Sequence, residues 1–156
     1  MDIRITPDFL RGSITVPPSK SISHRALICA ALADGESLLY NVLDCEDTRA
    51  TEDALRLLGA DITHSDGKII VDGISSRAKE AYIDCRESGS TLRFMIPIAA
   101  ALGTRTTFAG SANLPNRPIT PYLEELPKHG VRFLSEKMPY VIEGKLTVGS
   151  FSVTGD

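Results

Sequence analysis

The sequence of 156 residues has few of the features that mark several classes of protein. It has only three cysteines, too scattered for a disulfide framework or a zinc knuckle, so we expect buried free thiols at Cys29, Cys45 and Cys85. No run approaches the roughly 20 apolar residues that a membrane span needs. The stretch Met1–Arg4 lacks the apolar block of a secretory signal, so we expect a cytoplasmic protein.

An excess of positive charge is also missing. The 17 lysines and arginines are outnumbered by 20 acidic residues, giving a net charge of −3, which argues against a general nucleic-acid binder. Apolar residues make up 42% and charged residues 24% of the chain, close to the averages of globular proteins. This composition excludes wholesale disorder, and the length leaves room for one domain or two small ones.

The sequence does contain an α/β (α+β) pattern, in which short strands alternate with amphipathic helices. The order strand, helix, strand, helix, strand, strand occurs twice. In the first copy it predicts strands at 13–16, 37–40, 60–63 and 68–71, with helices at 26–33 and 47–58. In the second copy it predicts strands at 81–84, 106–109, 131–134 and 140–143, with helices at 90–102 and 120–129.

The two copies superimpose with a shift of about 70 residues, which indicates duplicated supersecondary units. Ile28–Leu32 matches Ile98–Leu102, and Gly59 matches Gly130. A third copy begins at Lys145, with a strand expected at Phe151–Thr154. Since an unpaired edge strand is an aggregation hazard, we interpret the chain as the N-terminal part of a longer protein. Chance similarity between two α/β stretches is the alternative.

Cations stand at the starts of the two matched helices. Lys20 lies at the entrance of the first helix and Arg25 about one turn further in, while the turn before the second contains Gly89 and Arg93. Helix N-termini are positive and favour acidic residues, so cations there are unfavourable unless an anion is present. Such helix starts suit phosphate or carboxylate. Capping serines beside solvated cations would explain one copy equally well, but the repetition favours an anion site.

Other charged residues give weaker signals. Arg117 lies in a proline-rich loop that biases its backbone to an extended conformation, and a guanidinium there suits carboxylate or phosphate recognition. Three acidic residues of the helix at 47–58 form no evident acid/base pair, and we interpret Asp47, Glu52 and Asp53 as a solvated face. The three histidines are interpreted as structural or surface residues.

Three motifs, at residues 17–27, 87–93 and 116–119, together resemble the 5-enolpyruvylshikimate-3-phosphate synthase family, and the likeness runs from about Ile3 to Asp156. The resemblance implies two globules, each of three strand-helix-strand-helix-strand-strand units, with about two units of one globule present here. Residues 1–18 would belong to the other globule and be poorly anchored. Residues 19–156 would form an incomplete globule, with repeat one to about residue 73, repeat two at about 80–144 and the start of repeat three at 145–156.

The resemblance also implies a reaction: transfer of the enolpyruvyl group of phosphoenolpyruvate to the 5-hydroxyl of shikimate 3-phosphate, with release of phosphate. This 3-phosphoshikimate 1-carboxyvinyltransferase reaction belongs to the shikimate pathway of aromatic amino acid biosynthesis. It proceeds by addition and elimination and needs no metal or organic cofactor. The implied partners are the two small anions, with no nucleic acid or membrane, and the intact enzyme is expected to be a monomer.

Site residues carry over from the motifs. Lys20 would contact both substrates, and Ser21 and Arg25 would hold shikimate 3-phosphate. Gly89 would offer its backbone amide to phosphoenolpyruvate, and Arg117 would clamp the charge of that substrate. Lys20 and Arg117 are the catalytic residues of this scheme, because cations that face two polyanions supply binding and electrostatic stabilisation together.

Ser90 and Arg93 also match the motif, and we assign them supporting roles in substrate binding. Glu87 departs from the pattern, since many family members carry Asn there. A carboxylate beside an anion site is unfavourable unless it pairs with Arg86, Arg93 or Lys20. A direct substrate contact by Glu87 is therefore not expected.

The acid/base carboxylates of the family would lie beyond Asp156, so we expect no turnover by this chain alone. A related enzyme, the UDP-N-acetylglucosamine enolpyruvyl transferase, carries a reactive cysteine before its Arg-Pro motif, and residues 110–115 contain none. A non-enzymatic phosphate- or RNA-binding module on the same repeat is the other alternative. The net negative charge and the scarcity of aromatics near the cations disfavour stacking on bases.

Overall fold

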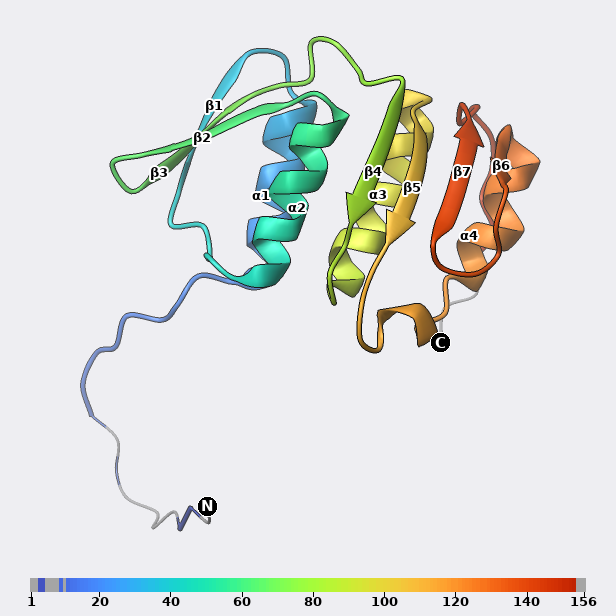
Figure 1. Cartoon of the computed structure of the whole chain (residues 1–156). Coiled ribbons are helices and arrows are strands. Elements are labelled where there is room, and N and C mark those ends of the chain that lie inside the picture. Colours follow the sequence, from blue (N-terminus) through green and yellow to red (C-terminus); the bar gives the residue numbers. More distant parts are fainter. Residues whose placement is uncertain (1–2, 5–8, 10, 154–156) are drawn as a thin grey trace.

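The computed structural model describes residues 3–4, 9 and 11–153. Its first unit packs two helices against one face of a three-stranded antiparallel sheet (Figure 1). The elements of this unit are α1 (Lys20–Leu32), β1 (Glu36–Tyr40), α2 (Glu46–Leu58), β2 (Asp61–Ser65) and β3 (Lys68–Asp72).

Local chemistry sets the ends of α2. Thr48 accepts a hydrogen bond from the backbone amide of Cys45 at 3.0 Å, which satisfies a group at the helix start. Glu46 and Asp47 add negative charge to the first turn, where the helix dipole is positive. The helix ends at Gly59, whose φ of 116° lies in the left-handed region that glycine adopts without steric cost.

The second unit has a four-stranded mixed sheet with its helices on one face (Figure 1). Its strands are β4 (Glu80–Asp84), β5 (Arg105–Ala109), β6 (Val131–Phe133) and β7 (Tyr140–Gly144). Its helices are α3 (Gly89–Leu102) and α4 (Thr120–Glu125), with 3₁₀ turns at Leu114–Asn116 and Leu126–His129.

Two prolines shape the helices of this unit. The helix expected at 120–129 is α-helical only to Glu125 and then tightens into a 3₁₀ turn, because Pro127 has no N–H for an α-helical bond. Pro97 lies inside α3 and leaves the carbonyl of Arg93, four residues earlier, without its helical donor. The hydroxyl of Tyr122 donates to that carbonyl at 3.0 Å, which ties α4 to α3.

The predicted duplication is confirmed by the sheet topology. The first sheet has the order β1-β3-β2, and the second contains the equivalent order β5-β7-β6, with all neighbours antiparallel in both. The hairpin expected around Asp66–Gly67 is the β2–β3 pair. Gly59 and Gly130 both end helical segments with left-handed φ angles, of 116° and 85°. In the second sheet, β4 adds a parallel neighbour to β5.

Two expected strands are absent from the structure. Residues 13–16 pair with no strand of either sheet, and Ile14 and Val16 are 88% and 67% exposed. In Figure 1 this segment runs away from the first unit. Phe151–Val153 also forms no strand; the segment crosses the end of α4, where Ser152 donates its amide to Glu125 at 3.2 Å. Thr154, the last residue of that expected strand, lies outside the described residues.

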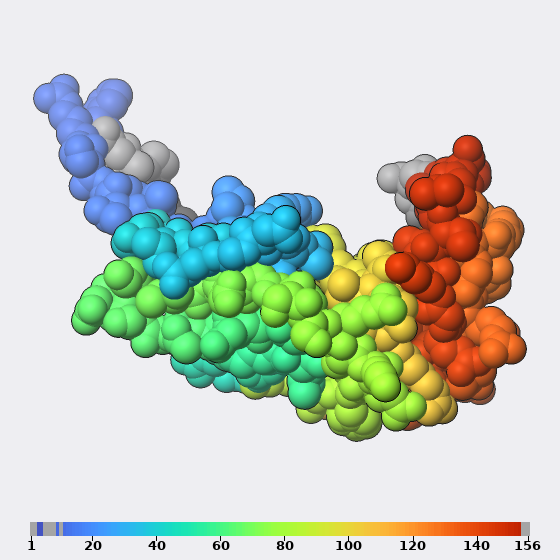
Figure 2. Space-filling model, turned by 90° about the horizontal axis from the view of Figure 1, so that it is seen from above, coloured from blue at the N-terminus to red at the C-terminus, as the bar shows by residue number. Residues whose placement is uncertain are grey.

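The two units share one hydrophobic core. Helix α2 contacts both α1 and α3, so the second helix of one unit packs on the first helix of the next. Figure 2 shows the units side by side along the molecule, with the N-terminal segment projecting from the end formed by the first. This arrangement brings the N-terminal turns of α1, α2 and α3 into one region.

Candidate active site

The starts of α1 and α3 have the same construction. Ser19 caps α1 by accepting the amide of Ile22 at 3.4 Å, and Ser88 caps α3 by accepting the amide of Thr91 at 3.1 Å. Neither helix has an acidic residue in its first turn, whereas α2 supplies two of its own. The free N–H groups of α1 and α3 therefore leave positive potential that is open to an external anion.

Lys20, the first residue of α1, forms an ion pair with Asp47 of α2. Its Nζ lies 2.6 Å from Asp47 Oδ2, with the two side chains 52% and 28% exposed. The hydrogen bond and charge of Asp47 raise the pKa of Lys20, while the positive charge of Arg117 is close enough to oppose that rise. The interpretation of Asp47 as part of a solvated face is thus wrong. Sequence spacing could not reveal this pair, since its partners lie 27 residues apart.

Gly89, Arg93 and Arg117 come together at the start of α3. A Cβ added at Gly89 would lie 2.6 Å from Arg117 Nη1 and 3.2 Å from Arg93 Nη1. Arg117 has the expected extended backbone, with φ −81° and ψ 127°. The Arg117 guanidinium therefore rests on the bare backbone of Gly89, beside N–H groups that no helical carbonyl accepts. Two guanidinium groups at a helix N-terminus form a setting for a carboxylate or phosphate.

Arg25 lies on the side of α1 that faces α3. Its guanidinium carbon is 5.1 Å from the ring centroid of Phe94, and its Nη1 donates to the carbonyl of Ser21 at 2.9 Å. Among the described residues, the hydroxyls of Ser21 and Ser90 have no hydrogen-bond partner. The structure thus places Lys20, Ser21 and Arg25 along one helix start and Gly89, Ser90 and Arg93 along the other.

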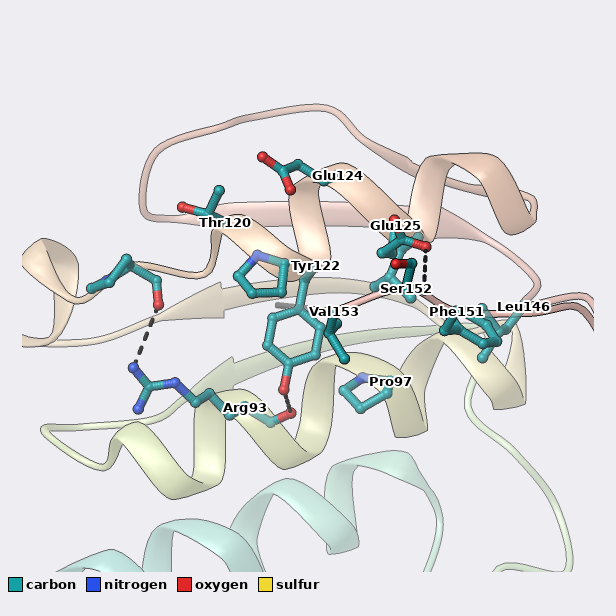
Figure 3. Close-up of a pocket in the computed structure, with 13 residues that line it drawn as sticks. Arg93, Pro97, Thr120, Tyr122, Glu124, Glu125, Leu146, Phe151, Ser152 and Val153 are labelled. Atoms are coloured by element: carbon teal, nitrogen blue, oxygen red, sulfur yellow. Dashed lines mark hydrogen bonds between the residues drawn. The ribbon is translucent and has the colours of Figure 1, made fainter. Parts of the chain in front are cut away.

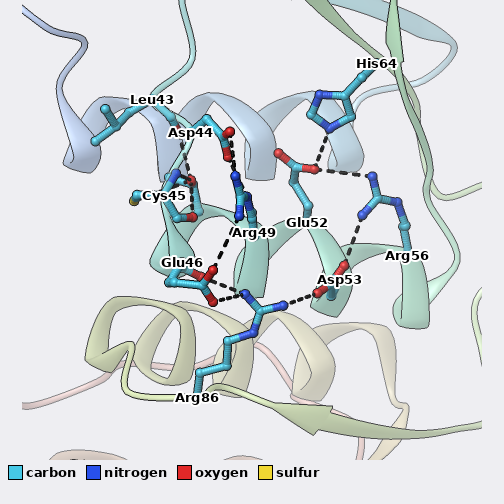
Figure 4. A network of polar contacts seen from close by, with 11 residues as sticks. Leu43, Asp44, Cys45, Glu46, Arg49, Glu52, Asp53, Arg56, His64 and Arg86 are labelled. Atoms are coloured by element: carbon cyan, nitrogen blue, oxygen red, sulfur yellow. Dashed lines mark hydrogen bonds and ion pairs between the residues drawn. The ribbon is translucent and has the colours of Figure 1, made fainter.

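A clamp of ion pairs holds the loop before α3 on α2. Arg86 donates to Glu46 Oε2 at 2.6 Å and to Asp53 Oδ2 at 2.8 Å, with its own backbone at a φ of 52° (Figure 4). Arg86 therefore fixes the loop that carries the α3 cap. Glu87, beside it, forms no ion pair within the part of the chain that the structure describes, so none of the three partners considered for it is used.

The acidic face expected on α2 is corrected further by Glu52. This residue is only 5% exposed, and its Oε2 lies 2.8 Å from His64 Nε2 and 3.2 Å from Arg56 Nη2 (Figure 4). Asp53 is paired with Arg56 as well as with Arg86. The carboxylates of Glu52 and Asp53 therefore pair with basic side chains of this protein and are not simply solvated.

The cysteines agree with expectation only in part. All three are free, but Cys29 is exposed and Cys45 partly exposed, so the expectation of burial is wrong for both. Cys85 is buried, and burial raises the pKa of its thiol to about 12. No group of three or more His, Cys, Asp or Glu residues suited to a metal ion occurs among the described residues.

A cavity of about 870 Å³ lies beside Arg93, between α3, α4 and the segment that follows β7 (Figure 3). Pro97 and Tyr122 form part of its wall, and Phe151 and Val153 line it from the C-terminal segment. Arg93 Nη2 approaches the carbonyl of Pro118 at its edge, at 3.4 Å. The cavity is largely apolar, in contrast to the charged helix starts.

Known proteins are similar to this chain in sequence and in fold. A family model described as EPSP synthase (3-phosphoshikimate 1-carboxyvinyltransferase) matches residues 5–156. The chain belongs to the EPSP synthase family. The 3-phosphoshikimate 1-carboxyvinyltransferase of Clostridium perfringens strain 13 is 42% identical over 156 residues, and that of Clostridium kluyveri 41% over 157. These alignments cover 97% and 99% of this chain and 37% of each relative.

Solved structures agree with the EPSP synthase assignment. Two structures of EPSP synthase from Acinetobacter baumannii match with TM-scores of 0.73 and 0.75, at 28% and 26% identity. The matches cover 86% and 91% of this chain but 32% and 34% of those chains. The chain therefore spans about a third of the length of its EPSP synthase relatives. No helix in the described part is long and apolar enough to cross a membrane.

Proposed function

We propose that this chain is part of a 3-phosphoshikimate 1-carboxyvinyltransferase, which transfers the enolpyruvyl group of phosphoenolpyruvate to the 5-hydroxyl of shikimate 3-phosphate and releases phosphate. One observation carries the proposal beyond family membership. The Arg117 guanidinium lies against Gly89 at the N-terminus of α3, beside backbone N–H groups that the Ser88 cap leaves free, and within electrostatic reach of Lys20. This arrangement suits two small polyanions bound side by side.

The proposed roles are those that the family motifs imply, and the positions of the residues are compatible with them. Ser21 and Arg25 hold shikimate 3-phosphate at the start of α1, and Gly89 and Arg117 hold phosphoenolpyruvate at the start of α3. Lys20 contacts both substrates and stabilises charge as the new bond forms, so Lys20 and Arg117 are the proposed catalytic residues. Substrate must compete with Asp47 for Lys20, since the two side chains are paired at 2.6 Å. Ser90 and Arg93 support phosphoenolpyruvate from the same helix.

The domain organisation is part of the same proposal. Residues 1–18 belong to a second globule, which agrees with the exposure of Ile14 and Val16. Residues 19–156 form two units and the start of a third around a pseudo-threefold axis. The exposed Ile22 on α1 and the cavity lined by Phe151 offer apolar surface to that third unit. The whole enzyme is proposed to act as a cytoplasmic monomer.

Calorimetric titration of the 156-residue chain with shikimate 3-phosphate tests this proposal. The wild-type chain should release heat on binding, and Lys20→Ala and Arg25→Ala should each abolish it. Lys79→Ala is the matched control, because Lys79 is an exposed lysine at the opposite end of β4 from the site. Absence of binding by the wild-type chain, or equal binding of RNA or a UDP-sugar, would overturn the proposal.

A further inference from the structure

A chain of buried hydroxyl groups connects the two units beneath the candidate site. His24 Nδ1 lies 2.8 Å from Thr51 Oγ1, which lies 2.8 Å from Thr91 Oγ1. Thr91 Oγ1 in turn lies 2.8 Å from Ser88 Oγ and 3.2 Å from the carbonyl oxygen of Asp47. All four residues are at most 1% exposed, with relative exposures of 0% for His24, Thr51 and Thr91 and 1% for Ser88.

The side chains of this hydrogen-bonded series lie directly behind the groups that face the site. His24 lies one helical turn after Lys20 on α1, and Thr91 lies two residues after Gly89 on α3. Thr51 is on α2, one turn after Asp47, and so lies between the other two helices. The His24–Thr51 bond therefore joins α1 to α2, and the Thr51–Thr91 bond joins α2 to α3. The Thr91–Ser88 bond lies within the start of α3, where Ser88 is the helix cap.

The protonation of His24 follows from its surroundings. Burial lowers the pKa of the imidazole, which Asp47 raises and Lys20 and Arg25 lower further, so the surroundings favour the neutral ring. Its Nε2 is buried with no hydrogen-bond partner among the described residues. Because a buried N–H without an acceptor is rarer than an unfilled acceptor, the proton belongs on Nδ1, where Thr51 accepts it.

That tautomer sets the direction of every bond in the chain. Thr51 accepts from His24 and so can donate its single proton to Thr91. Thr91 then donates to the carbonyl of Asp47 or to Ser88, whose Oγ also accepts the Thr91 amide. No hydroxyl in this series of hydrogen bonds has to donate twice. Each buried hydroxyl from α2 to the cap of α3 therefore has a hydrogen-bond partner.

We propose that His24, as the Nδ1–H tautomer, and Thr51 are positioning residues that fix the Gly89 amide of α3 relative to Lys20 and Arg25 of α1. The inference rests on the proposed function, since these are the groups assigned to the two substrates. The hydroxyl chain has a role that apolar packing would not reproduce, because hydrogen bonds specify distance and direction between helices.

The first test measures the tautomer in the wild-type chain by ¹⁵N NMR of the imidazole nitrogens. We expect Nδ1 of His24 to carry the proton at pH 7 and Nε2 to be unprotonated. A ring that is protonated on Nε2, alone or together with Nδ1, overturns the inference. The measurement needs neither substrate nor variant, so it stands apart from the proposed function.

The second test compares Thr51→Val, which removes the hydroxyl at nearly constant volume, with Thr51→Ser, which retains it. Thr106→Val is the matched control, because Thr106 is fully buried and bonds only the carbonyl of Thr104, at 3.1 Å, at the start of β5. We expect Thr51→Val alone to shift the Gly89 amide resonance and to weaken phosphoenolpyruvate binding, measured with shikimate 3-phosphate present, by about tenfold, because Gly89 is the group assigned to that substrate and weakening one hydrogen bond to a charged group costs about that much. Thr51→Ser should restore both.

The outcomes separate this inference from the proposed function. If the wild-type chain binds both substrates and Thr51→Val binds phosphoenolpyruvate equally well with an unmoved Gly89 resonance, the positioning role is wrong and the function stands. If the wild-type chain does not bind, the function is wrong, and the tautomer and the Gly89 resonance still decide the inference. Should Thr51→Val fail to fold, failure of Thr51→Ser to match the wild type counts against the positioning role.

Discussion

Substitution of Gly89 by alanine should weaken ligand binding without lowering the stability of the fold. The added Cβ would lie 2.6 Å from Arg117 Nη1, and an ordinary contact needs at least 3.4 Å, so the guanidinium must retreat by about 0.8 Å. The backbone tolerates the change, because Gly89 is not in the left-handed region. The nearest atoms belong to flexible arginine side chains rather than to backbone.

The expected magnitudes follow from these contacts. Alanine is a better helix former than glycine by up to about 1 kcal/mol, so the thermal midpoint should stay level or rise slightly. A hydrogen bond to a charged group contributes about 1.5–3 kcal/mol, and displacement of the Arg117 guanidinium weakens the one it would give to phosphoenolpyruvate. We therefore expect Gly89→Ala to weaken phosphoenolpyruvate binding by about 10- to 100-fold, or about 1.4–2.7 kcal/mol.

NMR titration with phosphoenolpyruvate in the presence of shikimate 3-phosphate measures this loss, since it follows weak affinities. The informative control is a double-mutant cycle with Arg117→Ala. If Gly89→Ala acts by displacing Arg117, the double variant should bind no more weakly than Arg117→Ala alone. Additive losses, or wild-type affinity in Gly89→Ala, would refute the reasoning from the 2.6 Å contact.

Three further predictions concern the frame around the site. Tyr122→Phe should lower the free energy of unfolding by about 1 kcal/mol, as measured by urea denaturation, because the carbonyl that the helix proline frees loses its donor; an unchanged midpoint would contradict this. Cys85 should resist alkylation at pH 8 in the folded chain while Cys29 reacts, as mass spectrometry can check, since the Cys85 pKa of about 12 keeps its thiol protonated. The ion pair with Lys128 and the Ser152 amide lower the pKa of Glu125, so its stabilising effect is present above its ordinary pKa of 4.5 and lost as pH falls through the lowered value. Melting curves should thus show Glu125→Gln less stable than wild type at pH 7, with the gap closing in acid.

Much of the fold was predictable because its signals are local. The helical spacing of α2 and the left-handed stops at Gly59 and Gly130 depend on neighbouring residues alone, and the duplicated order of elements followed from them. The strand predicted at residues 13–16 is an exception, and its absence has a physical reason. Residues 13–16 have the alternation of a strand but no partner strand, and backbone pairing requires one.

The candidate site was predictable in its residues but not in its contacts. The cations at two equivalent helix starts stood out because they break the usual preference for acids at that position. No local signal indicated that Lys20 would pair with Asp47, or that Thr51 would join His24 to Thr91. Those residues look like ordinary surface and core positions on their own helices.

The sequence by itself determined the repeat, the family and the two helix starts that carry free donors and cations. The tertiary structure decided which charge meets which. Arg117 contacts Gly89, and Lys20 forms an ion pair with Asp47. Arg86 pairs with Glu46 on α2 and not with its neighbour Glu87. The physical reason is range: helix signals act over about one turn, whereas the partners in these pairs lie 27 to 40 residues apart in the chain and meet only when the elements that carry them pack together.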